Sequence, residues 1–309
     1  MLRIVPVFLL LLASLPASGN EKLVALTFDD GPRPYVLFGQ SGAPGLIHVL
    51  DQAHVNATFF VMGWRLTPRT WGDHRFETNI GINCVDAVRA LVKRGDEIED
   101  HTYSHVQLET AEKSKGEAWV IHDIQHGAEL IEAVSGRRPV YVRPPDWILP
   151  EDARHDLEQR GYHILTIKGP APVPLRDINS LDYLCAGLRP VHCPKPSLSA
   201  SVLRQIELRE KKGIYTHILA FHELSTTTTM LPELITDLRA RGYRFVTIRE
   251  YMKLVGPHSI TAQNDRPHLR DVSHSTSAPL GLLHPLGELP HPPKGEAYEP
   301  LSLPAAGKM

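Results

Sequence analysis

The sequence contains few cysteines and no excess of charge of either sign. Three of its 309 residues are cysteine, and no Cys-x-x-Cys pair occurs, which argues against a zinc site built from thiolates. Lysine and arginine together number 33, and aspartate and glutamate together number 35. A chain this close to neutral gives no reason to expect a nucleic acid or an anionic membrane surface as its partner.

Long apolar runs are also scarce. The run from Ile4 to Leu15 is interrupted by Pro6 and is shorter than the ~20 residues that a membrane-spanning helix needs. Arg3 precedes this run and small residues follow it, which is typical of a secretory signal. We therefore predict a signal peptide at residues 1–19, with a signal anchor as the alternative. The mature protein would be secreted or periplasmic and would have no transmembrane span.

Export permits disulfide formation. Cys185 and Cys193 enclose a short loop that contains glycine and proline, so these two cysteines could pair easily. We predict that they form a disulfide and that Cys84 remains a free, buried thiol.

Apolar, β-prone segments alternate with helical patterns along most of the chain. The strands are predicted at 23–28, 57–62, 97–100, 140–143, 163–167, 217–222 and 244–248, and the helices between them at 45–54, 85–94, 117–134, 152–160, 199–212 and 231–241. Seven strands joined by right-handed crossovers predict an α/β fold with a parallel sheet, closed or nearly closed into a barrel. An open doubly wound sheet is the alternative, but no Gly-x-Gly-x-x-Gly follows any strand.

The alternation ends before residue 257. Residues 257–309 contain nine prolines and five histidines and show no apolar periodicity. We predict a disordered tail rich in proline, histidine and serine at 257–309 and a single catalytic domain at 20–256.

Two adjacent carboxylates follow the first predicted strand. Asp29 and Asp30 precede Gly31-Pro32, which ends the strand and places both acids at its carboxyl edge, where α/β proteins usually build their sites. The same residues would also suit a turn or a helix cap. Because consecutive strand residues face opposite sides, only one of the two acids can point at a given partner. This also argues against a glycosidase, whose two carboxyls must stand ~5 Å or more apart across the sugar.

A histidine pair follows the third predicted strand. His101 and His105 are four residues apart, a spacing that on a helical turn places both imidazoles on one side. One carboxylate from the first strand would complete a set of two nitrogens and one oxygen, which is the ligand set of a catalytic zinc with open positions. The alternative is an exposed pair in a chain that contains 17 histidines.

Four segments together resemble the polysaccharide deacetylase family, the NodB-homology domain of carbohydrate esterase family 4. They are Thr27-Phe28-Asp29-Asp30-Gly31-Pro32, His101-Thr102-Tyr103-Ser104-His105, Arg143-Pro144-Pro145, and the strand that ends at His222. The resemblance covers residues 22–251 and implies a distorted (β/α)7 TIM-like barrel of the NodB-homology type.

The resemblance also implies a role for each of these side chains. Asp29 would be the general base, Arg143 would pair with it, and His222 would be the general acid. A divalent metal ion, with zinc as the first choice, would be held by Asp30, His101 and His105.

The chain departs from the family pattern at two places. Arg-Pro-Pro is followed by Asp146 and Trp147 where the family has an aromatic residue, so the wall that faces the sugar, which we assign to Pro145, Asp146 and Trp147, differs. The family's Asp-Trp, which orients the acid histidine, has its nearest match in Asp182-Tyr183 after an insertion. We assign that role to Asp182, with Asp177 as the rival.

These assignments predict an exported, metal-dependent hydrolase. It would remove N-acetyl groups from N-acetylglucosamine-containing glycans, such as peptidoglycan or chitin-like oligomers, and act as a monomer. The alternatives are an O-acetyl xylan esterase, because the same groups would cleave an ester, and a carbohydrate-binding relic with impaired catalysis.

Overall fold

The computed structural model describes residues 21–40, 42–67, 82–167, 171, 173–185 and 193–256. The predicted signal peptide at 1–19 and the predicted tail at 257–309 lie outside these residues. Among the described helices, none is both long and apolar enough to cross a membrane.

A parallel sheet forms the centre of the described structure. Its strands are β1 (Leu23–Gly31), β2 (Thr58–Val61), β3 (Glu97–Asp100), β4 (Tyr141–Val142), β5 (His163–Ile164), β6 (Asp177–Asn179), β7 (Thr216–His222) and β8 (Arg244–Val246). The order is β5-β4-β3-β2-β1-β7-β6, and β8 pairs with the first part of β1. The amide of Asp177 donates to the carbonyl of Thr166 at 3.0 Å, which links β6 back to the segment after β5. The predicted distorted α/β barrel is confirmed.

Seven strands lie along the barrel path, but they are not the seven that the sequence predicts. The final predicted strand, β8, lies off the path, and β6 takes its place. Strand β6 has only three residues, and Ile178 is its one apolar side chain, so it shows no alternation that could identify it. Strand β5 is also shorter than predicted and ends at Ile164.

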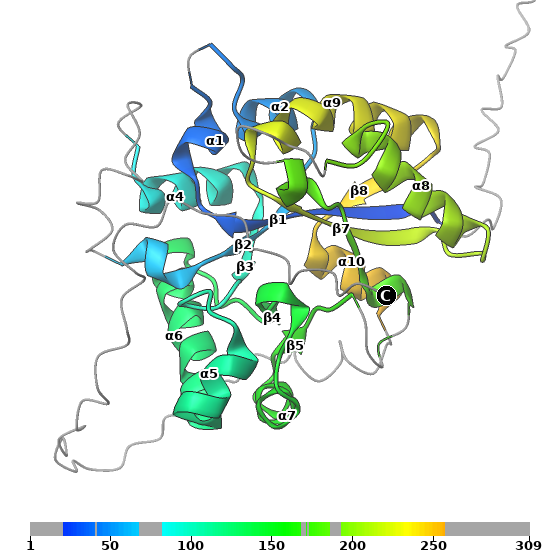
Figure 1. Cartoon of the computed structure of the whole chain (residues 1–309). Coiled ribbons are helices and arrows are strands. Elements are labelled where there is room, and N and C mark those ends of the chain that lie inside the picture. The colour runs from blue at the N-terminus through cyan, green and yellow to red at the C-terminus, as the bar shows by residue number, and fades with distance from the viewer. Residues whose placement is uncertain are drawn as a thin grey trace, which may run out of the picture.

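Helices surround this sheet. They are α1 (Pro34–Phe38), α2 (Leu46–Gln52), α4 (Cys84–Arg94), α5 (Leu108–Lys115), α6 (Glu117–Ser135), α7 (Glu151–Gln159), α8 (Leu198–Glu210), α9 (Ser225–Ala240) and α10 (Ile248–Val255). In Figure 1, α2, α8 and α9 lie on one side of β1, and α5, α6 and α7 lie on the other.

Helix α9 begins at Ser225, six residues before the predicted start. Its first turns contain four consecutive threonines, whose branched side chains have a low intrinsic helix propensity. A tertiary contact opposes that preference, since the buried Thr227 hydroxyl donates to Asp182 at 2.6 Å.

Strand β1 is buried along its whole length, and it pairs with other strands on both edges. The centre of the Phe28 ring lies 5.2 Å from the ring centre of Phe59 on β2 and 6.0 Å from the ring centre of Phe221 on β7. This aromatic packing fixes the end of β1 just before Asp29 and Asp30.

The cysteine predictions are also confirmed: Cys185 and Cys193 form a disulfide, and Cys84 is a buried free thiol.

Candidate metal centre

Asp30, His101 and His105 converge at the carboxyl ends of β1 and β3. One ligand atom from each lies within 4.8 Å of the others, and this is the one such group of three among the residues that the structure describes. Asp30 Oδ1 is 3.4 Å from Nε2 of His101 and 3.1 Å from Nε2 of His105. The predicted ligand set is therefore brought together in space.

The two histidines lie on an irregular loop, so the predicted helical turn is wrong. Thr102 and His105 both adopt left-handed backbone conformations, with φ of 66° and 55°. The loop is fixed from α6, where Asp123 accepts hydrogen bonds from the amides of Tyr103 and Ser104. The centres of the two imidazole rings still lie 4.8 Å apart. Tertiary contacts of the loop therefore bring the two rings together, as the i, i+4 spacing suggested.

Hydrogen bonding around His101 shows that the three residues fit a cation. Its Nδ1 lies 2.5 Å from the Arg143 carbonyl, which only accepts, so Nδ1 carries the proton and Nε2 of the neutral ring carries a lone pair. That lone pair faces Asp30 Oδ1, a buried oxygen with no hydrogen-bond donor. A cation between acceptors that face one another in a buried space would stabilise them, and two imidazoles with one carboxylate are ligands that suit a divalent metal ion.

Electrostatics keep Asp30 available as an anion. Burial acts to raise its pKa, but the positive charge of a protonated His105 and the hydrogen bonds that both imidazoles can donate when no cation separates them from Asp30 outweigh burial and hold the pKa of Asp30 well below its ordinary value. Its second oxygen, Oδ2, accepts from Arg33 at 3.2 Å, and the Arg33 amide donates to the buried Glu223 at 2.6 Å. Arg33 and Glu223 were not identified from the sequence, because neither lies in a pattern that suggests a ligand.

Asp29 has a different partner from that of Asp30. Its Oδ1 accepts from Nη1 of Arg143 at 2.6 Å, and both side chains are almost fully buried. The different directions of the two acids follow partly from strand pleating and partly from a break in the strand register, where Asp30 adopts a φ of 66°. The predicted pairing of Arg143 with Asp29 is therefore present.

His222 lies at the end of β7, next to Asp29 on β1. Its Nδ1 is 2.7 Å from Asp182 Oδ1, and its amide donates to Asp182 Oδ2 at 2.7 Å. Burial acts to lower the pKa of His222, but the attraction of the Asp182 carboxylate and its hydrogen bond raise it to about 9. The structure therefore places Asp182, and not Asp177, beside the histidine.

We expect Asp182→Asn to move the alkaline limb of the pH–activity profile to lower pH. If protonated His222 is required, activity is lost as the pH rises through the pKa of His222, and removing the Asp182 charge lowers that pKa. Asp30 and Asp29 also raise the pKa of His222, by less than Asp182 does, and a bound cation would offset their effect. The alkaline limb of the wild-type profile should therefore lie below pH 9. Turnover measured between pH 5 and 10 for both proteins checks this, and coincident alkaline limbs would exclude the assigned pairing.

Asp177 has a different partner, which the sequence did not indicate. Both of its oxygens accept from Arg143, at 2.8 and 3.0 Å, and Oδ2 also accepts from the indole of Trp147 at 2.7 Å. The predicted wall residues lie in the turn η2 (Pro145–Trp147): Pro145 is buried, Asp146 is exposed and Trp147 is half-buried. This turn follows β4 by two residues, at the edge of the sheet where the metal ligands lie.

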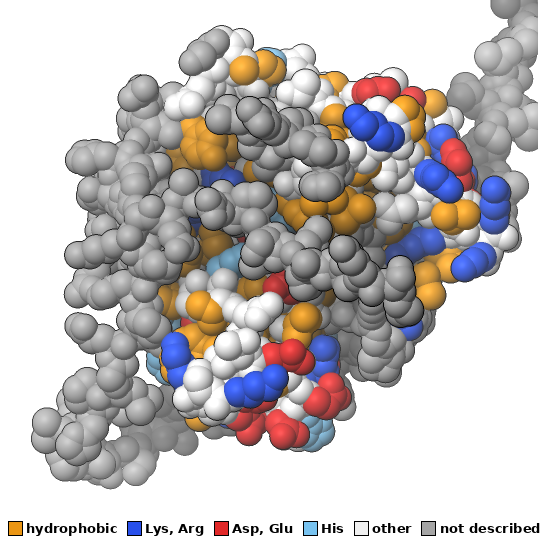
Figure 2. All heavy atoms as spheres, in the orientation of Figure 1, with side chains coloured by type: hydrophobic (Ala, Val, Ile, Leu, Met, Phe, Trp, Pro, Cys, Tyr) orange, Lys and Arg blue, Asp and Glu red, His pale blue; other side chains and the backbone are white. Residues whose placement is uncertain are grey.

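The surface around this edge brings polar and apolar groups together. Figure 2 shows histidine and acidic side chains in a depression between hydrophobic side chains.

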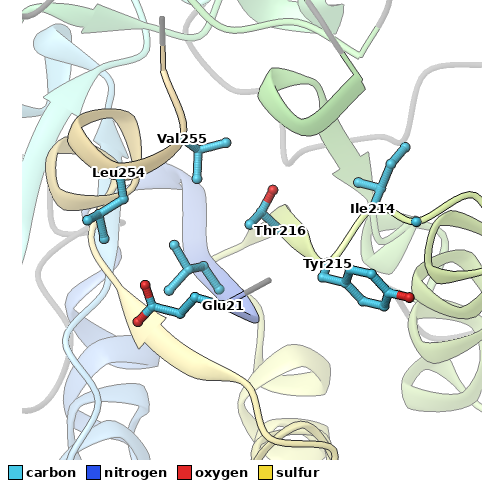
Figure 3. A pocket seen from close by; sticks show the side chains of 8 residues that line it. Glu21, Ile214, Tyr215, Thr216, Leu254 and Val255 are labelled. Carbon is cyan, nitrogen blue, oxygen red and sulfur yellow. The ribbon is translucent and has the colours of Figure 1, made fainter. Parts of the chain in front are cut away.

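A separate hollow of about 310 Å³ lies at the opposite end of β1 and β7, where Leu23, Thr216 and Val255 contribute to its lining (Figure 3). Among the described residues that line it, Glu21 alone has a carboxylate, so the groups suited to chemistry gather at the carboxyl edge instead.

Comparison with known proteins agrees with this geometry. Residues 17–165 match the family model described as polysaccharide deacetylase. A chitin deacetylase of Colletotrichum lindemuthianum is 29% identical over 230 residues, which cover 74% of this chain and 78% of that protein. A peptidoglycan-N-acetylglucosamine deacetylase of Bacillus cereus is 24% identical over 238 residues, which cover 76% of this chain and 90% of the relative.

The fold also matches solved structures. A family 4 acetyl xylan esterase from Clostridium thermocellum, solved in complex with a cobalt ion, superimposes with a TM-score of 0.53 at 22% identity. The superposition covers 75% of this chain and 91% of the esterase. At this identity the likeness shows the shared fold.

Proposed function

Because the chain belongs to the polysaccharide deacetylase family, we propose that it hydrolyses the N-acetyl groups of N-acetylglucosamine-containing glycans and releases acetate. Peptidoglycan and chitin-like oligomers are the proposed substrates. The observation that carries this proposal is the meeting of three groups at one edge of the sheet: the ligand set around Asp30, the Asp29–Arg143 pair and the His222–Asp182 pair.

Asp30, His101 and His105 would hold the divalent metal ion, which we propose to be zinc. When bound, such an ion supplies a Lewis acid that lowers the pKa of water and polarises the acyl oxygen. The remaining work falls to side chains of this chain and to the backbone amide of Asp146, which we assign as a donor to the oxyanion.

Asp29 is assigned as the general base. Arg143 binds its Oδ1, so the other oxygen, Oδ2, is the one that would accept the proton of the attacking water. Arg143 cannot compete for this proton because a guanidinium remains charged at any working pH. Its pKa is raised further by Asp177 and Asp29, which outweigh the effect of burial.

His222 is assigned as the general acid. Asp182 holds Nδ1, so Nε2–H would donate to the leaving nitrogen. An amide needs this proton more than an ester does, because without it the nitrogen would have to leave as an amide anion, which is a much poorer leaving group than an alkoxide. This difference favours N-deacetylation over cleavage of acetylxylan, and the complete acid and base pairs favour an enzyme over a binding relic.

We further propose that the protein is exported through a signal peptide at residues 1–19, acts outside the cytoplasm and works as a monomer. The domain then comprises residues 20–256. Mass spectrometry of the exported protein tests this boundary, and the proposal requires an N-terminus close to Asn20.

Acetate release from a panel of substrates tests the proposed function. The purified protein, supplied with zinc, is given peptidoglycan, chitooligosaccharides and acetylxylan. We expect acetate from at least one of the two N-acetylated substrates at a rate above that from acetylxylan. Acetate from acetylxylan alone would favour the esterase, and binding of a glycan without acetate release would favour the relic.

A further inference from the structure

Trp147 lies in a turn whose backbone conformation is costly. Asp146 and Trp147 have φ values of 55° and 57°, in the left-handed region that residues with a side chain rarely occupy twice in succession. Such a conformation persists only where surrounding contacts fix it. The turn therefore needs an anchor on the barrel.

The indole of Trp147 provides this anchor. Its Nε1 donates to Oδ2 of Asp177 at 2.7 Å, and the same oxygen accepts from Nε of Arg143 at 2.8 Å. Asp177 Oδ1 accepts from Nη2 of Arg143 at 3.0 Å, so the carboxylate binds the guanidinium through two parallel hydrogen bonds. The third nitrogen of the guanidinium, Nη1, donates to Asp29 at 2.6 Å.

A continuous chain of hydrogen bonds thus runs from Trp147 through Asp177 and Arg143 to Asp29. The side chain of Asp177 is fully buried, and Arg143 lies with its guanidinium carbon 4.1 Å from the centre of the Phe60 ring. Of these four hydrogen-bonded residues, Trp147 alone is half-buried, and the other three are buried. Because the guanidinium is planar and rigid, the direction in which Asp177 holds it sets the direction of Nη1 and hence of the Asp29 carboxylate.

We propose that Trp147 is a positioning residue for the general base. Its indole N–H fixes the Asp177 carboxylate, and Asp177 in turn orients Arg143 against Asp29. This inference rests on the proposed function, and it extends the wall role assigned to Trp147 from the sequence. It predicts a defect in turnover rather than in sugar binding when the N–H is removed.

Trp147→Phe tests this directly, because phenylalanine keeps an aromatic face and removes only the donor. We expect kcat for acetate release from the N-acetylated substrate that the wild type hydrolyses to fall ~10-fold, in the range typical for residues that orient a catalytic group through another side chain. KM and the zinc dissociation constant should stay near the wild-type values. Trp119→Phe, on α6 where the indole lies against Lys115, is the matched control and should leave kcat unchanged.

A double-mutant cycle with Asp177→Asn separates positioning from general damage. If Trp147 acts through Asp177, the double variant should be no slower than Asp177→Asn alone. Independent, multiplied losses would overturn the inference, as would an increase in KM with unchanged kcat in Trp147→Phe. If Asp177→Asn does not fold, the two single variants test the inference. A lower kcat with unchanged KM in Trp147→Phe, but not in Trp119→Phe, would support the positioning role, and any other pattern would overturn it.

The wild-type rate distinguishes this inference from the proposed function. An active wild type with an unaffected Trp147→Phe variant refutes only the positioning role. A wild type that releases no acetate from any glycan refutes both.

Discussion

Asp29→Asn is expected to lower turnover ~10²–10⁴-fold, the usual effect of removing a general base, while the protein still binds its metal ion. Asparagine fits the space of Asp29 but cannot accept the proton of the attacking water. The side chain of Asp29 binds Arg143 and is not part of the group formed by Asp30 and the two histidines. Metal content and acetate release, measured on the same sample, check both parts of this expectation.

Asp30→Asn is the matched control because it makes the same chemical change at the neighbouring residue. Here an anionic ligand becomes neutral, so the affinity for metal should fall and excess zinc should restore part of the activity. Loss of metal from Asp29→Asn together with its retention in Asp30→Asn would show that the two roles are reversed.

His105→Ala should remove stoichiometric metal binding and reduce activity below that of Asp29→Asn. The variant leaves only His101 and Asp30, and a catalytic site normally has three protein ligands. His105 is partly exposed at the rim of the loop, so its truncation should cost little folding stability. His48→Ala, at an exposed position on α2, is the control and should match the wild type in metal content and turnover.

The sequence predicts the barrel well because its long strands and helices have strong periodic patterns. Strand β1 illustrates this, since its near-continuous apolar run reflects burial on both faces. Strand β6 could not be predicted, because three residues with one apolar side chain form a strand only through pairing with β7. The start of α9 was missed for the opposite reason, since its threonines have low helix propensity and are held by contacts such as that of Thr227 with Asp182.

The site shows the same division. Local motifs identify Asp29, Asp30 and the histidine pair, and the structure brings the ligand residues together. The loop that carries His101 and His105 depends on Asp123 of α6, which lies 18 residues beyond His105 and belongs to no motif. The choice between Asp177 and Asp182 likewise depended on distances that a sequence does not contain, and the structure gives each acid a different partner.

The most direct test of the central claim is a zinc titration of the metal-free protein in which zinc binding and acetate release from the N-acetylated substrate that the wild type hydrolyses are followed together. The wild type should bind one equivalent of zinc at this site and gain activity in proportion to occupancy, and His105→Ala should do neither. Full acetate release by the metal-free wild type, or one tightly bound zinc ion in His105→Ala, would contradict the assignment of Asp30, His101 and His105 as the metal centre.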